Sequence, residues 1–282
     1  RNRLHPAAAA ALAQSIVSLD GLISLEADIS FSSLGEDGAQ ELAQAVGCLR
    51  GLQRLNLALG GCGLGATGTR KLAQELAHLR SLTRLRIDLS FNDIGDSGLQ
   101  ELSLAIGGLS DLTSLNLDLN RNRMGDMGAG WLAQAVAELP GLSDLQLSIF
   151  DNRIGEAGVH ELAQAARLLR APTRFALGLN RNAVSEAAVQ DLADAVGTLR
   201  TLRQLELHLS ISSAGWAAAH DLSLALRELR GLTHLVLDLN VNQVGAAGAR
   251  LLAQALADLR RLTSLRLLCS GNRVRDVGAK EL

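Results

Sequence analysis

The stretch "LRIDLSFNDIGDSGLQEL", from Leu85 to Leu102, decides the fold. Its first part alternates apolar and polar residues with a period of two, at Leu85, Ile87 and Leu89, which is the pattern of a β-strand. Asn92 follows, and after it the apolar residues take the wider spacing of one helix face. This one stretch therefore predicts a strand, a turn and a helix in that order.

The same pattern returns every 30 residues along the chain. One column is leucine without exception: Leu12, Leu42, Leu72, Leu102, Leu132, Leu162, Leu192, Leu222, Leu252 and Leu282. The asparagine column contains Asn2, Asn92, Asn122, Asn152, Asn182, Asn242 and Asn272, with Ser32, Cys62 and Ser212 as substitutes. Such self-similarity predicts a solenoid of stacked repeats rather than a single globule.

The asparagine has a physical reason in such a stack. Where the chain leaves the strand, backbone groups would be buried without partners, and each would destabilise the fold by roughly 1–3 kcal/mol. An inward asparagine carries two donors and an acceptor, so we expect it to bridge to the neighbouring turn. Acidic residues precede many of the predicted helices and arginines follow many of them, as the helix dipole favours.

The motif L-x-x-L-x-L-x-L-x-x-N-x-I-G-D-x-G-A-x-x-L-A-x-A-L resembles a leucine-rich repeat of the long, helix-containing, ribonuclease-inhibitor type. An extra L-x pair in the strand lengthens the repeat to 30 residues, and repeat arrays of protists with this extended strand are similar. The resemblance covers the whole chain. It implies an α/β solenoid, a right-handed β-α superhelix forming a horseshoe segment with parallel strands on the concave face and helices on the convex face.

We expect one leucine-rich-repeat domain over residues 1–282, made of a partial repeat (1–21), eight full repeats (22–261) and a partial repeat (262–282). Nine strands should start near Leu22, Leu52, Leu82, Leu112, Leu142, Pro172, Leu202, Leu232 and Leu262. Because the chain begins and stops within a repeat, we interpret it as a segment of a longer chain that belongs to a larger complex. End-to-end association is the alternative.

Composition narrows the functional class. A net charge of −2 offers no strong field for nucleic acid, and no apolar run reaches transmembrane length. The three cysteines, Cys48, Cys62 and Cys269, are too scattered for a disulfide framework, which indicates the cytoplasm or another reducing intracellular compartment. No histidine has metal-ligand spacing, and the G-x-x-G stretches are turn elements, so we expect no metal, no cofactor and no catalytic residue.

The main candidate for partner binding lies on adjoining strands and comprises Arg54, Arg84, Arg86, Asp88, Asn116 and Asp118. Residues 30 apart are lateral neighbours in the predicted sheet, which places Arg54 beside Arg84 and Asp88 beside Asp118. Like charges at strand spacing repel mildly, so a partner of complementary charge would relieve the repulsion. The alternative is a solvated polar face in which Arg and Asp side chains neutralise one another.

Two further groups are secondary candidates. The first comprises Glu206, His208, His234 and Asp238. A His–Asp pair suggests catalysis, but no Ser or Cys nucleophile accompanies it, so we favour a lateral charge pair. The second is a small apolar patch of Leu104 and Trp131 on adjacent helices, which sometimes marks an interface and is otherwise ordinary surface.

These observations favour a non-enzymatic module that binds a protein partner on the concave strand face. The strand columns carry no aromatic anchor of the kind that dominates tight interfaces, so the contact should be polar and guided by charge. One alternative is a structural scaffold or spacer that packs through its convex helices. Another, by analogy with members of the family, is a regulator of a GTPase or other enzyme.

Overall fold

The computed structural model of the chain describes residues 6–210 and 215–274. Asn2, Ser212 and Leu282 of the predicted columns lie outside these residues. The chain divides into two compact units, Arg1–Leu142 (unit 1) and Ser143–Leu282 (unit 2). Each unit is built by the same alternation of helix and strand.

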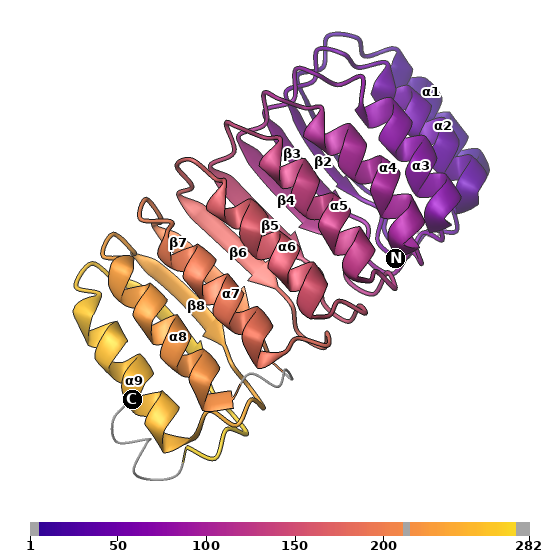
Figure 1. The fold of residues 1–282 in the computed structure, drawn as a ribbon. Helices are drawn as coiled ribbons and strands as arrows, with labels where there is room; N and C mark the ends of the chain where they lie inside the picture. The colour runs from indigo at the N-terminus through magenta and orange to yellow at the C-terminus, as the bar shows by residue number, and fades with distance from the viewer. Residues whose placement is uncertain (1–5, 211–214, 275–282) are drawn as a thin grey trace. The chain divides into compact units, whose positions relative to one another are not determined.

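Unit 1 contains four parallel strands in sequence order. Its elements are α1 (Pro6–Val17), β1 (Ser24–Asp28), α2 (Gly35–Gly47), β2 (Arg54–Ala58), α3 (Gly65–Leu76), β3 (Arg84–Asp88), α4 (Gly95–Gly107), β4 (Ser114–Asp118) and α5 (Asp126–Ala137). Every residue of β1, β2 and β3 pairs with the residue 30 positions further on, so the predicted register is confirmed. Figure 1 shows α4 and α5 in front of β3 and β4, on one face of the sheet.

Unit 2 repeats this design with five parallel strands. Its elements are β5 (Asp144–Ser148), α6 (Glu156–Arg167), β6 (Arg174–Gly178), α7 (Glu186–Gly197), β7 (Gln204–His208), α8 (Gly215–Glu228), β8 (His234–Asp238), α9 (Gly245–Asp258) and β9 (Ser264–Leu268). Here too the pairing offset is 30 residues. The predicted α/β solenoid fold is confirmed in both units.

The core of each unit lies between its strands and its helices. In unit 1 the alternating residues Leu55, Leu57 and Leu59 are at most 2% exposed, and Leu42 and Leu72 of the facing helices are 1% exposed. Fully burying a leucine stabilises the fold by roughly 1.5–3 kcal/mol. The leucine columns are therefore the main source of stability, and the residues between them are left to face solvent.

The strands begin two residues later than predicted, at Arg54 rather than Leu52, for example. The backbone N–H of Leu52 donates to the carbonyl of Leu49 (2.9 Å), which places Leu52 in the turn that closes the helix–strand connection. The pairing with the previous repeat starts only at the next two residues, where Gln53 and Arg54 both donate to the carbonyl of Ile23. A buried leucine at the head of the apolar run therefore belongs to the turn.

The asparagine column bridges adjacent turns, as predicted. In Asn92, Nδ2 donates to the carbonyls of Leu59 and Leu89, both at 2.9 Å. Its Oδ1 accepts from the backbone N–H groups of Cys62 (3.0 Å) and Leu64 (3.2 Å). Asn122 in unit 1 and Asn182, Asn242 and Asn272 in unit 2 make corresponding bonds.

Cys62 shows what a substitute contributes in that column. Its Sγ donates to the carbonyl of Ile29 (3.2 Å). Burial raises the pKa of the Cys62 thiol, which keeps the donor proton in place. The thiol therefore replaces the donor of the asparagine side chain towards the previous turn, but it has no amide oxygen to accept from the backbone N–H groups there.

An acidic residue at the start of one helix also accepts hydrogen bonds from the start of the next helix. Oδ1 of Asp96, in the first turn of α4, accepts from the backbone N–H groups of Gly125 (2.8 Å) and Gly128 (3.0 Å) at the start of α5. In unit 2, Glu156 accepts from the hydroxyl of Ser185, and that hydroxyl accepts from the N–H of Ala188. Asp96 therefore satisfies N-terminal amide groups of the next helix directly, and Glu156 does so through the Ser185 hydroxyl.

Among the described helices, none combines the length and the apolar composition that crossing a lipid bilayer requires.

Candidate functional site

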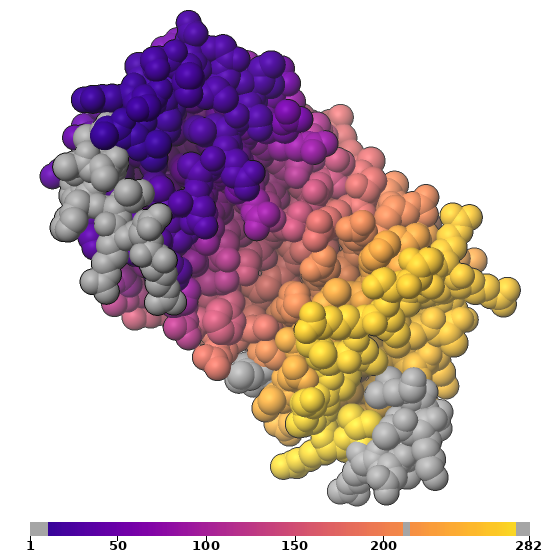
Figure 2. Space-filling view, turned by 180° about the vertical axis from the view of Figure 1, so that it is seen from behind, coloured from indigo at the N-terminus to yellow at the C-terminus, as the bar shows by residue number. Residues whose placement is uncertain are grey.

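The strand face of unit 1, formed by the side chains of β1–β4 that point away from the helices, carries three exposed arginines. Arg54 and Arg84 are direct partners on β2 and β3, and Arg86 lies two residues further along β3. We call these three residues the arginine cluster. Within the described part of the chain, none of their guanidinium groups makes a hydrogen bond or an ion pair. This face is turned away from the viewer in Figure 1 and towards the viewer in Figure 2.

Acidic residues end three of the four strands of this face: Asp28, Asp88 and Asp118. Asp88 and Asp118 are in register. Each Oδ1 accepts from the backbone N–H two residues later, at Ser30 (3.1 Å), Ser90 (2.9 Å) and Asn120 (3.0 Å). The acids therefore close the turn that leaves the strand. The sequence pattern predicts partner binding or a solvated polar face for Asp88 and Asp118 and not this turn, although the spacing Asp-x-Ser/Asn is a signal for it.

The environments of these carboxyl groups differ. Burial raises the pKa of Asp118, and the nearby carboxylate of Asp88 acts in the same direction, against the Asn120 amide and the Arg86 charge. By contrast, hydrogen bonds from the backbone and side chain of Ser30 lower the pKa of the exposed Asp28. The acidic row is thus graded from an exposed carboxylate on β1 to a half-buried one on β4.

Asn116, the remaining predicted residue of this group, lies half-buried on β4 in register with Arg86. On β2, Asn56 donates to Glu26 Oε1 at 2.9 Å, so the only other acid of the strand columns here is already engaged. The structure thus brings the six predicted residues together on three neighbouring strands. Arg54 and Arg84 lie at the start of their strands, Arg86 lies in the middle of β3, and the two acids lie at strand ends.

The secondary candidates of unit 2 lie on β7 and β8 and are paired with other side chains. Glu206 accepts from Arg174 at 2.8 Å. Nδ1 of His208 lies 3.9 Å from Oδ2 of Asp238, a residue that is 7% exposed. His234 contacts the hydroxyl of Thr233 (2.9 Å). Within the described residues, no cluster of three or more His, Cys, Asp or Glu side chains is placed to hold a metal ion.

Two phenylalanines were missed by the sequence analysis. Phe31 and Phe91 are 53% and 46% exposed and lie in the turns that follow β1 and β3. Their ring centroids are 6.3 Å apart, and the guanidinium of Arg121 lies 5.0 Å from the Phe91 ring centre. The strand columns of unit 1 contain no aromatic residue, as predicted, but aromatic side chains border them. The sequence signal for these rings is the residue directly before the asparagine column, which is Phe, Gly, Phe and Arg in successive repeats.

A family model described as "Leucine Rich repeat" matches residues 78–103, which include β3 and the first part of α4. The other repeats have the same apolar columns and the same backbone. These are leucine-rich repeats. The crystal structure of the Rad7 and Elc1 complex in yeast contains a chain similar to this one at 16% identity, over 94% of this chain and 77% of that chain, with a TM-score of 0.33. That TM-score is too low for the likeness to bear on function. No curated protein sequence matches the chain.

On the helix side of the leucine-rich repeats in unit 1, the structure brings Leu104 and Trp131 together. Leu104 on α4 is 54% exposed, whereas Trp131 on α5 is half-buried. Both line a small hollow together with Gln134 and Glu138. The predicted pair is therefore adjacent, with Leu104 as its exposed member and polar residues at its border.

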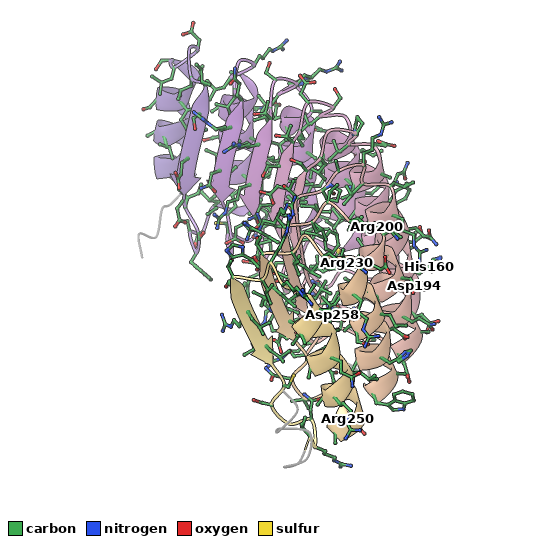
Figure 3. The ribbon with its side chains drawn as sticks, turned by 90° about the vertical axis from the view of Figure 1, so that its left-hand side faces the viewer. His160, Asp194, Arg200, Arg230, Arg250 and Asp258 are labelled. Carbon is green, nitrogen blue, oxygen red and sulfur yellow. The ribbon has the colours of Figure 1, made fainter. Side chains whose placement is uncertain are left out.

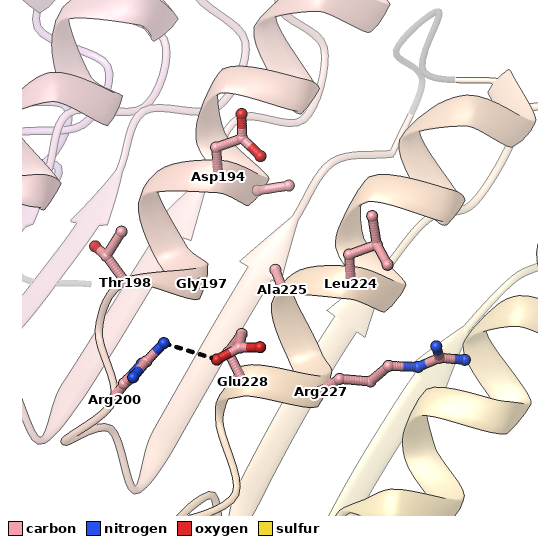
Figure 4. Close-up of a pocket in the computed structure, with 9 residues that line it drawn as sticks. Asp194, Gly197, Thr198, Arg200, Leu224, Ala225, Arg227 and Glu228 are labelled. Carbon is pink, nitrogen blue, oxygen red and sulfur yellow. Dashed lines mark hydrogen bonds and ion pairs between the residues drawn. The ribbon is translucent and has the colours of Figure 1, made fainter.

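The leucine-rich repeats of unit 2 carry an open groove of about 530 Å³ between α7 and α8 (Figure 4). Asp194 and Leu224 project from its two helices, and Arg200 donates to Glu228 at 2.9 Å across its end. Figure 3 labels charged residues on the helices of unit 2 and the turns after them: His160, Asp194, Arg200, Arg230, Arg250 and Asp258. His160 contacts Asp191 on the next helix (2.7 Å), so this pair, like Arg200 and Glu228, links neighbouring repeats.

Proposed function

We propose that the chain is a protein-interaction module that binds an acidic segment of a partner protein on the strand face of unit 1. One observation carries this proposal. The side chains of the arginine cluster, Arg54, Arg84 and Arg86, are exposed and make no hydrogen bond or ion pair within the described residues.

The geometry of the cluster favours carboxylates. Arg54 and Arg84 occupy adjacent strands, which lie about 4.8 Å apart, so their charges repel. A carboxylate between two guanidinium groups would remove the repulsion and would accept planar, bidentate hydrogen bonds from them. An acidic peptide is therefore the chemistry that these three side chains fit best.

In unit 2 the same strand column holds an arginine whose charge is paired within the chain. Arg174 stands in the column of Arg54 and Arg84, and it donates to Glu206 on the next strand. The position equivalent to Glu206 is Asn116 for Arg84 and Arg86 for Arg54, 32 residues onward in each case. An uncharged residue and a like charge thus replace the internal carboxylate, which leaves the cluster available to an external one.

The test is selection of peptides by the immobilised full chain from a phage-displayed random dodecapeptide library. We expect the selected peptides to be enriched in Asp and Glu. The double variant Arg84→Glu, Arg86→Glu should lose them. Arg50→Glu, Arg80→Glu is the matched control, because it makes the same charge change in the same unit at exposed positions just after α2 and α3. Selected peptides without acidic enrichment, or equal loss in the control, would contradict the proposal.

A second candidate function is a scaffold contact through the helices of unit 1. It is supported by the adjacency of Leu104 and Trp131 around one hollow. Chemical crosslinking of the full-length protein in its native complexes, followed by mass spectrometry, distinguishes the two. Crosslinks concentrated at α4 and α5, and abolished by Leu104→Lys, would favour the scaffold, whereas crosslinks at β2–β4 favour peptide binding.

A further inference from the structure

The turns beside the arginine cluster hold two aromatic rings in a backbone conformation that does not suit them. The residue before the asparagine column has a positive φ in the described repeats of unit 1: Phe31 (+57°), Gly61 (+65°), Phe91 (+59°) and Arg121 (+53°). Glycine and asparagine adopt this region readily, whereas a bulky side chain there is disfavoured. The same conformation recurs at this column with other side chains, such as Arg121 and Val241, so the turn itself does not require a ring. Both rings are nevertheless about half exposed, where burial does not explain them.

The repeat between the two phenylalanines lacks side chains at the same place. Its turn reads Gly60-Gly61-Cys62-Gly63. A Cβ atom on Gly61 would lie only 2.7 Å from Cδ1 of Phe31, so the Phe31 ring occupies the space above this turn. Nothing lies within 4 Å of a Cβ atom on Gly63, where most other described repeats carry a side chain. The result is a hollow of about 360 Å³ that Phe31, Ser33, Gly61, Cys62 and Gly63 help to line.

The rings lie in the turns at the ends of the strands, beyond the acidic row of Asp28, Asp88 and Asp118. Phe91 follows Arg86 by five residues on the same strand and turn, which corresponds to at most roughly 17 Å at about 3.3 Å per residue. The backbone still pairs with its neighbour at this point, because Phe91 N donates to the carbonyl of Asn120. An extended peptide lying on this face would therefore reach from the arginines to the rings with about five residues.

We propose that Phe31, Phe91 and the hollow over Gly61 form an apolar anchor site that receives one large apolar side chain of the acidic partner segment. The occupant is an extended protein segment with carboxylates for the arginine cluster and a Trp, Phe or Leu about five residues away. The proposal rests on the proposed function for the acidic part of the segment. Aromatic anchors in a recess typically supply most of the affinity of such contacts, and charges mainly supply orientation and speed of association.

The test compares Phe31→Asn, Phe91→Asn with Val241→Asn. Asparagine tolerates positive φ, so the double variant should keep the turn. Val241 is the matched control, because it occupies the same column in unit 2 with φ +58° and 55% exposure. The probe is a fluorescein-labelled peptide taken from the random-library selection on the wild-type full chain, measured by fluorescence anisotropy, with thermal unfolding as a check of folding.

We expect the selected peptides to pair acidic residues with Trp, Phe or Leu, and the double phenylalanine variant to bind at least about tenfold more weakly. The control should bind as the wild type does. Acidic peptides whose binding is unchanged in the phenylalanine variant would overturn the anchor site and leave the proposed function standing. Peptides that need the phenylalanines but tolerate Arg84→Glu, Arg86→Glu would overturn the proposed function and the shared occupant.

Discussion

Arg174 and Glu206 form an ion pair of 2.8 Å between β6 and β7, on positions where unit 1 has Arg84 and Asn116. The two arginines have the same strand position, but their neighbours differ. On the previous strand Arg84 is in register with Arg54, whereas Arg174 is in register with Asp144. On the next strand only Arg174 has a carboxylate, that of Glu206, within reach. Arg174 and Glu206 are each about two-thirds covered by surrounding atoms, whereas Arg84 is exposed. The charge of Arg174 is therefore neutralised within unit 2, whereas that of Arg84 is not neutralised within unit 1.

Asn116→Glu should convert the binding face of unit 1 into the arrangement of unit 2. The new carboxylate would lie where Glu206 lies relative to Arg174, so it would occupy Arg84 and repel an acidic partner. We expect the affinity for the selected acidic peptide to fall about tenfold, while stability changes by less than about 1 kcal/mol, as for surface ion pairs. Anisotropy titration and urea unfolding measure the two effects. Asn116→Gln, which adds no charge, is the control and should bind as the wild type does.

Salt should weaken the same complex. The arginine cluster is exposed, and raising the ionic strength from about 0.1 M to about 1 M shortens the screening length from about 10 Å to about 3 Å. We expect peptide affinity to fall by about tenfold over this range. The residual binding of the Arg84→Glu, Arg86→Glu variant should show little salt dependence, and an equally steep slope in that variant would contradict a charge-guided contact.

Sequence periodicity predicted the parts of the fold that recur identically, and it failed where one repeat differs from the next. The leucine columns and Asn92 were predictable because the same burial problem returns every 30 residues. Whether Arg84 has an internal partner was not predictable, because the residue that decides it stands 32 positions further on and in a different column, as Glu206 does for Arg174. Phe31 was overlooked because its significance lies in a positive φ, which no apolar periodicity reveals. The turn role of Asp88 was overlooked because its spacing to Ser90 was treated as surface variation.

Asn92 should be one of the most sensitive polar positions. It is 2% exposed and makes hydrogen bonds with backbone groups of its own turn and of the previous repeat. Asn92→Ala would leave several of these groups buried without partners, and we expect a loss of about 2–4 kcal/mol in the free energy of unfolding. Asn92→Cys, which reproduces the residue found at position 62, should lose less, because a thiol still donates one bond. Equal losses in chemical denaturation would contradict this ranking.

Asp118 should make stability depend on pH in the direction opposite to that of a typical surface acid. Its native pKa is raised, mainly by burial, so the folded state binds this proton more tightly than the unfolded state does. The resulting stabilisation is complete below the unfolded pKa of about 3.9 and disappears as pH rises through the native value. Asp118→Asn keeps an acceptor for the Asn120 amide and removes the buried charge. We expect a higher midpoint of thermal unfolding than wild type at pH 7, with the difference shrinking towards pH 4. Asp28→Asn is the control and should not stabilise, because the pKa of Asp28 is lowered.

Phe91→Asn tests whether the exposed ring is retained for stability or for another reason. Removing the ring deletes its contacts with Phe31 and Arg121, worth about 0.5–1.5 kcal/mol for an aromatic pair. Asparagine at φ +59° relieves a left-handed conformation that is unfavourable by roughly 1–2 kcal/mol for an ordinary residue. The two effects nearly cancel, so we expect a change within about 1 kcal/mol in urea unfolding. Phe175→Ala, which removes a ring that is 2% exposed in the core of unit 2, should lose about 3–5 kcal/mol by contrast. A loss in Phe91→Asn as large as that in Phe175→Ala would make the ring a structural element and remove the reason for assigning it to a partner.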